Sequence, residues 1–221
     1  MQTFTTPAPI TAVLDIPAGR IQVVAADRAD TTVDIRPADA SKGRDAKAAE
    51  QTGVAFGDGV LRVTGPGAAN RHFGPTGAVE VAIQVPTGSD VDVTSSYTEF
   101  RGVGRLGRVA GQGLGGGVRI DEAAGAHLTA FDDVSVGRLG GPAEISTEKG
   151  DVTVGEAVSG TVVLSTRMGD VAIAAAPGVS ASLDAGTGHG RVHNSLKNAD
   201  GSPGLAIRAT TGQGDITARA L

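Results

Sequence analysis

Four aspartates recur at one position of a short repeat and are the strongest candidates for chemistry in this chain. Asp133, Asp151, Asp170 and Asp215 each lie at the start of an apolar–x–apolar run. If the repeats stack as strands, neighbouring carboxylates would stand about 5 Å apart and could share a cation such as Ca²⁺. Alternatively, each carboxylate accepts backbone N–H bonds and caps its own turn. We call these four residues the Asp column.

Two repeats depart from the Asp column, since Gly117 and Arg191 occupy the same position. The calcium-binding nonapeptide repeat is also absent. The chain contains no Cys, which excludes disulfides, thiolate zinc sites, iron–sulfur clusters and a cysteine nucleophile. We therefore expect a structural role for the Asp column and no bound metal.

Two further motifs match enzyme signatures but lie in the wrong context. Residues 111–116 satisfy G-x-G-x-x-G, yet the strand expected at 118–120 follows where a dinucleotide site requires a helix. Ser146 and Lys149 have the S-x-x-K spacing, which brings the two side chains together on a helix. Here that spacing ends a strand, so we reject both motifs.

The histidines show no metal-binding arrangement. His189 and His193 are four residues apart, which on a strand separates them by roughly 13 Å. His72 and His127 have no partner nearby in the sequence. We assign no catalytic, cofactor-binding or metal-ligating residue, and we expect no cofactor.

Composition excludes several classes of partner. Among 221 residues, 24 are acidic and 19 basic, and the net charge of −5 argues against a dedicated nucleic-acid or anionic-membrane binder. No window approaches 18 uninterrupted apolar residues, so we expect no membrane span. The first ten residues have neither a basic nor an apolar segment of a signal peptide. We expect a cytoplasmic protein.

The second half of the chain is organised by a repeat. The first apolar residue of each run falls at positions 118, 134, 152, 171, 192 and 216. A second short strand is expected between these runs, at 126–129, 144–147, 162–166, 181–184 and 205–208. Glycine is abundant, with 34 residues, and the apolar residues alternate with period two, which predicts an all-β fold. We favour a β-solenoid, specifically a right-handed parallel β-helix; the alternative is an antiparallel β-sandwich.

The first half is expected to contain strands and one helix. Strands are expected at 10–16, 20–24 and 31–35, and residues 41–52 are rich in helix formers, with Ser41 as a possible N-cap. We interpret this helix as a cap on exposed strand edges. The chain is expected to form a single domain, 1–221, with N-terminal strands in 1–95 and regular repeats in 96–221.

The units T-x-x-G-D-[VI]-x-[VI] at 147–154 and 166–173 resemble a bacterial family of β-strand-repeat domains of unknown function, labelled "putative adhesin". The resemblance extends over nearly the whole chain and includes the inserted helix and the run 85–93. It implies a β-helical, non-enzymatic domain and, by family analogy, a cell-envelope location as the alternative to the cytoplasm. The family commonly has Ser before Gly-Asp, whereas this chain differs there, with Lys149, Met168, His189 and Gln213, and Asp132 in the earlier unit.

Two functions from different classes follow. The first is a non-catalytic interaction or scaffold module whose partner is an unknown protein or envelope component. The alternative is a carbohydrate-active enzyme on a β-helix, of the polysaccharide lyase or hydrolase type, which needs two converging acids and normally aromatic sugar platforms. With Tyr97 the single Tyr and no Trp, we favour the first function.

Overall fold

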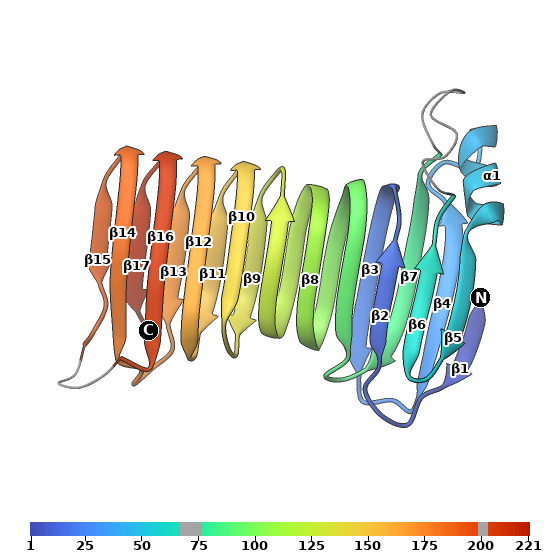
Figure 1. The fold of residues 1–221 in the computed structure, drawn as a ribbon, viewed down its shortest axis with the longest axis horizontal. Helices are drawn as coiled ribbons and strands as arrows, with labels where there is room; N and C mark the ends of the chain where they lie inside the picture. The colour runs from blue at the N-terminus through green and yellow to red at the C-terminus, as the bar shows by residue number, and fades with distance from the viewer. Residues whose placement is uncertain (67–76, 199–202) are drawn as a thin grey trace. The chain divides into compact units, whose positions relative to one another are not determined.

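The structure is a computed structural model that describes residues 1–66, 77–198 and 203–221. Within these residues the chain forms seventeen β-strands and one α-helix (Figure 1). The all-β prediction is confirmed. By its internal contacts the chain divides into two compact units, residues 1–116 (unit 1) and 117–221 (unit 2), which we describe separately. The single domain 1–221 stays a prediction.

Unit 1 contains seven strands, the helix and the first part of an eighth strand. They are β1 (Gln2–Thr5), β2 (Thr11–Asp15), β3 (Ala18–Ala26), β4 (Asp30–Pro37), α1 (Gly43–Gln51), β5 (Gly53–Gly57), β6 (Val60–Thr64), β7 (Val79–Pro86) and β8 (Asp90–Ala130), which continues into unit 2. The strands expected at 10–16, 20–24 and 31–35 are β2, β3 and β4.

The first repeat of unit 1 lies between two later ones. β2 runs parallel to both β6 and residues 90–94 of β8. β3 likewise runs parallel to both β7 and residues 97–103 of β8. The outer strands are antiparallel: β5 pairs with β6, β4 with β7, and β1 with β4. These antiparallel strands cover the edges that β6 and β7 would otherwise leave open.

Helix α1 confirms the helix expected at 41–52, and it packs against β4 and β7. Asp45 in its first turn is only 3% exposed. Its Oδ1 accepts the backbone N–H of Ala78 at 3.1 Å, just before β7. A buried carboxylate needs such a partner, so this bond fixes the start of the helix beside the sheet.

The prediction that Ser41 is the N-cap of the helix is wrong. Lys42 is the N-cap residue and makes no side-chain capping bond. The Ser41 N–H and hydroxyl instead donate to Oδ1 of Asp39, at 3.0 and 2.6 Å. The Ser41 hydroxyl, with Lys42 beside it, lowers the pKa of Asp39 to about 2. The Ser41 hydroxyl, expected to cap the helix, therefore bonds to Asp39 in the preceding turn.

Unit 2 begins within β8 and contains nine further strands. They are β9 (Val134–Leu139), β10 (Ala143–Lys149), β11 (Val152–Ala157), β12 (Gly160–Met168), β13 (Val171–Ala175), β14 (Ala181–His189), β15 (Val192–Ser195), β16 (Leu205–Gln213) and β17 (Ile216–Ala220). All the strands expected in this half of the chain coincide with these elements or with β8.

The strands of unit 2 form two rows in which every pairing is parallel. One row runs from residues 126–130 of β8 through β10, β12 and β16 to β14. The other runs from residues 118–123 of β8 through β9, β11, β13 and β17 to β15. Strands that follow each other in sequence thus lie in different rows.

The last repeat of the chain is inserted out of order. β16 pairs with both β12 and β14, and β17 pairs with both β13 and β15. Figure 1 shows β16 and β17 between these neighbours. The repeat formed by β14 and β15, which precedes it in sequence, is therefore displaced to the edge of unit 2.

The apolar residues expected to face inward are buried, with the exception of Val192. Val192 was expected in the core but is 44% exposed. It pairs with the fully buried Ile216, but its strand β15 is at the edge, so no further repeat covers it. The other residues of the expected core are at most 3% exposed: Val118, Ile120, Val134, Val136, Val152, Val154, Val171, Ile173 and Ile216.

Replacing Val152 by Asp should lower the free energy of unfolding by about 5 kcal/mol, because the new carboxyl group would be buried without a hydrogen-bond partner. Val152 is 0% exposed between Val134 and Val171. Urea unfolding measures the free energy. Thr153→Asp, one residue along the same strand and exposed, is the matched control and should change stability by less than about 1 kcal/mol. Equal losses in both variants would mean that the strand register is wrong.

The inserted last repeat can be tested by disulfides, because the chain has no native Cys. Ser165 of β12 is directly opposite Thr210 of β16, and Thr210 is directly opposite Gly186 of β14. Ser165→Cys with Thr210→Cys should oxidise to a disulfide, since adjacent strands bring Cα atoms within about 5 Å. Ser165→Cys with Gly186→Cys should not, because β16 lies between them. The opposite result would restore sequence order to the stack.

Candidate functional site

The Asp column forms a chain of hydrogen bonds from one repeat to the next. Oδ1 of Asp133 accepts the backbone N–H of Asp151 at 2.8 Å, and Oδ1 of Asp151 accepts that of Asp170 at 2.8 Å. Asp170 accepts the N–H of Asp215 at 2.7 Å, and Asp215 accepts the N–H of Arg191 at 2.8 Å. Each carboxylate thus satisfies a backbone donor of the neighbouring repeat and not, as one alternative had it, of its own turn.

The column is continuous in space although Arg191 interrupts it in sequence. Because the last repeat is inserted, Asp170 meets Asp215 directly and Arg191 comes after both. The Arg191 guanidinium also pairs with Oδ2 of Asp215 at 3.0 Å. The Arg191 backbone N–H, and next its side chain, lower the pKa of Asp215 below its usual value.

The threonine of the T-x-x-G-D unit makes the return connection. Its hydroxyl donates to the carbonyl of the residue before the column in the neighbouring repeat. The four bonds are Thr147 to Asp132 at 2.8 Å, Thr166 to Gly150 at 2.9 Å, Thr211 to Gly169 at 2.8 Å and Thr187 to Gly214 at 2.9 Å. All four threonines occupy inward-facing positions, in β10, β12, β16 and β14 respectively.

A glycine precedes three of the four column residues, and at Gly169 and Gly214 the backbone conformation and the space available exclude other side chains. Gly169 has φ of +153° and Gly214 has φ of +147°. A Cβ on Gly214 would overlap the carbonyl oxygen of Gly169, and a Cβ on Gly169 would overlap that of Gly150. The turns therefore stack at backbone contact, which brings each carboxylate within reach of the next N–H.

These contacts make the Asp column part of the bonding between repeats. Among the described residues, no three His, Cys, Asp or Glu side chains are placed to hold a metal ion. One oxygen of each carboxylate, Oδ1, accepts a backbone N–H. Since the N–H carries partial positive charge, it also reduces the repulsion between neighbouring carboxylates.

The other sequence motifs are not brought together into a site. Residues 111–116 lie wholly within β8, with no helix after them. Ser146 and Lys149 lie along strand β10. His189 ends β14 and His193 lies on β15, both exposed.

The remaining histidines add no site. The exposed His127 Nδ1 lies 3.5 Å from Oε2 of Glu144 on the paired strand, which is a surface contact. His72 lies outside the described residues.

A row of alternating charges in unit 1 was missed in the sequence. Across β4, β7, β3 and β8 the pairing aligns Arg36, Glu80, Arg20 and Glu99. Nε of Arg20 lies 2.8 Å from Oε2 of Glu99 and its Nη1 lies 3.5 Å from Oε1 of Glu80. These residues are up to 79 positions apart, so no spacing signal could have indicated them.

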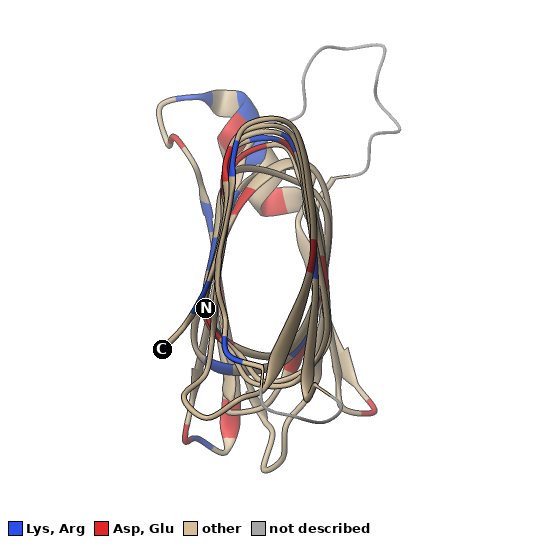
Figure 2. Ribbon diagram, turned by 90° about the vertical axis from the view of Figure 1, so that its left-hand side faces the viewer, with Lys and Arg blue, Asp and Glu red and all other residues tan. Residues whose placement is uncertain are grey.

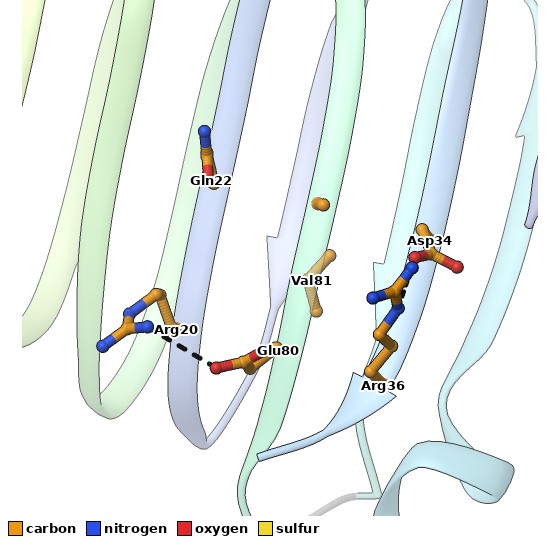
Figure 3. A pocket seen from close by; sticks show the side chains of 7 residues that line it. Arg20, Gln22, Asp34, Arg36, Glu80 and Val81 are labelled. Atoms are coloured by element: carbon orange, nitrogen blue, oxygen red, sulfur yellow. Dashed lines mark hydrogen bonds and ion pairs between the residues drawn. The ribbon is translucent and has the colours of Figure 1, made fainter.

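The row borders a shallow pocket of about 240 Å³ (Figure 3). Two carboxylates, Asp34 and Glu80, line it, and a glycosidase would need two acids in such a pocket. Asp34 Oδ2 lies 2.7 Å from Nε of Arg36, and Glu80 faces Arg20. Both carboxylates are thus engaged by guanidinium groups from the pocket wall, as the sticks in Figure 3 show.

A comparable charged row exists in unit 2, and here the sequence carried a signal. Arg138 on β9 lies 3.1 Å from Glu122 on β8 and 3.2 Å from Glu156 on β11. The spacings of 16 and 18 residues follow the repeat. Such exposed pairs contribute little to stability individually.

No protein-family model matches this chain, and no curated protein matches it by sequence. Solved structures do. A putative cell adhesion protein from Clostridium sporogenes is 12% identical over 100% of this chain and 98% of its own, with a TM-score of 0.42. A putative adhesin from Bacteroides fragilis is 14% identical, covering 98% and 95%, with a TM-score of 0.48.

A third similar structure is a putative lipid binding protein from Parabacteroides distasonis, 11% identical over 98% of this chain and 95% of its own, with a TM-score of 0.39. The similar solved structures thus include proteins named as bacterial adhesins. At these identities and TM-scores their names transfer no activity, partner or site to this chain.

Calcium should not change the melting temperature, because the carboxylates of the Asp column are used by backbone N–H groups. The measurement is a thermal melt with chelator and then with millimolar calcium. Binding to the folded state alone would stabilise it by about 2.7 kcal/mol at a hundredfold excess over Kd. A rise of several degrees that Asp151→Asn with Asp170→Asn abolishes would reassign the column as a cation site.

Proposed function

We propose that this protein is a non-catalytic interaction or scaffold module. The observation that carries the proposal is that the repeated Thr, Gly and Asp residues bond one repeat to the next. The residues with the strongest chemical signal in the sequence therefore serve to hold a rigid stack. Rigid repeats of this kind commonly present extended surfaces to a partner.

We infer that unit 2 is a β-solenoid in which each repeat contributes one strand to each of two rows. Parallel pairing throughout the unit, and alternation of successive strands between the rows, support this inference. An antiparallel sandwich would require antiparallel neighbours in each sheet. The preference of parallel crossovers for one hand favours a right-handed coil.

Each of the two rows of unit 2 has one line of small side chains on its outer side, which we call face A and face B. Face A consists of Thr129, Ser146, Ser165 and Thr210. Face B consists of Ser135, Thr153, Ala172 and Thr217. Strand pairing repeats these positions about every 4.8 Å. Face B also has a shallow depression of about 80 Å³ beside Thr153 and Thr217. Such surfaces fit an extended or repetitive partner, whether a protein or an envelope component.

The carbohydrate-active enzyme is the weaker alternative, because Asp34 and Glu80 in the pocket of unit 1 are both paired with arginines. Within the described residues, no helix is long and apolar enough to cross a membrane. The cytoplasmic location expected from the first ten residues gains no support from the structure or from the similar proteins.

The proposal is tested by charging one face at a time. Ser165→Glu with Thr210→Glu alters face A, and Thr153→Glu with Thr217→Glu alters face B. Binding of the immobilised protein to separated soluble and envelope fractions of a bacterial lysate is measured by interferometry. We expect saturable binding to one fraction, weakened at least tenfold by one double variant only, so that each variant controls for the other.

A parallel assay addresses the enzyme alternative. The protein is incubated with pectin, alginate, xylan and chitin, and release of reducing ends and of unsaturated sugar is followed. We expect neither product. Cleavage of any polysaccharide that Glu80→Gln abolishes would replace the interaction module with an enzyme acting in the pocket of unit 1.

A further inference from the structure

The repeat formed by β14 and β15 has one side without a strand partner. Among the described residues, β14 pairs only with β16 and β15 only with β17. The N–H of Ala181 at the start of β14 is an exception, because it donates to the carbonyl of Lys197. An edge of this kind presents backbone donors and acceptors to any strand that lies beside it.

The backbone groups that face this edge can be identified. The Arg191 N–H donates to Asp215 and the Arg191 carbonyl accepts the N–H of Ile216, so both point toward β17. Along a strand these groups alternate between the two sides. The N–H and C=O of Val192 and of Asn194 therefore point away from β17, toward the edge.

The edge is also apolar on its inner side. Val192 pairs with Ile216, which is 0% exposed, yet Val192 itself is 44% exposed. On β14, Leu183 pairs with the buried Ile207 but is only half-buried. These inward-facing side chains lack the covering repeat that their counterparts have.

On its outer side the edge carries an arginine, Arg191, whose guanidinium pairs with Oδ2 of Asp215 at 3.0 Å. Arg191 has 77% of its side chain exposed, and His189 and His193 close to it in sequence are exposed. Arg191 occupies the position where four other repeats have an acceptor carboxylate. Another repeat of the same kind would bring its backbone N–H against a guanidinium, which donates and cannot accept. The edge is therefore unsuited to a further T-x-x-G-D repeat.

Figure 2, drawn from the side on which β14 and β15 lie in Figure 1, shows tan ribbon along most of the strand walls, with charged residues mainly near the turns. Arg191 lies in the turn between β14 and β15. It adjoins the exposed Val192 directly in sequence, so a single bound strand can contact both.

We propose that the β14–β15 edge binds an extended segment of another protein in which apolar and acidic residues alternate. Its backbone pairs with the edge-facing groups of Val192 and Asn194, as in strand addition to other sheets. Its apolar side chains cover Val192 and Leu183. Its carboxylates lie on the opposite side, beside Arg191 and His193, because side chains alternate along a strand. This site is separate from faces A and B.

The test uses two synthetic peptides that differ only in charge. One is acetyl-Thr-Val-Glu-Val-Thr-Val-Glu-Val-amide, and the other has Lys in place of both Glu. We expect the acidic peptide to bind the whole protein at least tenfold more tightly by calorimetry. In nuclear magnetic resonance, the amide protons of Val192 and Asn194 should become protected from exchange when it binds.

Arg191→Glu should reverse the preference, so that the Lys peptide binds more tightly than the Glu peptide. The matched control is Arg167→Glu, which alters an arginine with 74% side-chain exposure in an inner repeat and should leave the preference unchanged. If Arg191→Glu does not fold by circular dichroism, Arg191→Gln replaces it and should weaken binding of the acidic peptide at least threefold.

Three outcomes overturn the proposal. Equal affinity for the two peptides would remove the electrostatic basis. Protection of amides on face A or face B, with none at Val192 and Asn194, would place the peptide elsewhere. A dimer of the unaltered protein in sedimentation that protects Val192 and Asn194 would make a second copy of this chain the occupant of the edge.

Discussion

Hydrogen bonds between successive turns are the constraint on which unit 2 depends. A stack of parallel strands satisfies its backbone within the rows, but the turns between rows carry N–H and C=O groups that the strands do not reach. The Asp carboxylate accepts the N–H of the next turn, and the Thr hydroxyl donates to the carbonyl of a neighbouring turn. Glycine at the preceding position allows the close approach that both bonds need. Thr, Gly and Asp together thus satisfy the backbone N–H and C=O groups of the turns, and this explains why the three residue types recur as a unit.

The same constraint accounts for the distribution of charge. Unit 2 places carboxylates at neighbouring turns, about one strand spacing apart, in a chain that is already acidic. Each carboxylate accepts a backbone N–H of a neighbouring repeat through its Oδ1. Outside the turns, charges alternate across the strands: Arg138 lies between Glu122 and Glu156, and Arg20 lies between Glu80 and Glu99. In both groups the acidic side chains are engaged by a hydrogen-bond donor or an arginine.

Edges are treated differently in the two units. In unit 1 the first repeat, β2 and β3, lies inside, and antiparallel strands cover the outer edges of β6 and β7. In unit 2 the last repeat, β16 and β17, also lies inside, but the displaced β14 and β15 pair on one side only within the described residues. Arg191 lies at that edge, in the position where an Asp could accept the backbone N–H of a further repeat. The departure at Arg191 thus coincides with the edge at which β14 and β15 pair on one side only within the described residues.

The sequence by itself determined the all-β class, the strands of unit 2, the strands β2, β3 and β4 of unit 1, the helix and most of the inward-facing residues. It could do so because period-two alternation and glycine-rich turns are local properties of the chain. It also identified the Asp column. It did not indicate that the carboxylates bond to neighbouring repeats, that Arg191 ends the column, or that Val192 is exposed. Those depend on which repeats are neighbours, and the order of the stack differs from the order of the chain. Repeats with the same pattern fit beside one another equally well by sequence, so only tertiary packing decided that the last repeat lies between β12–β13 and β14–β15.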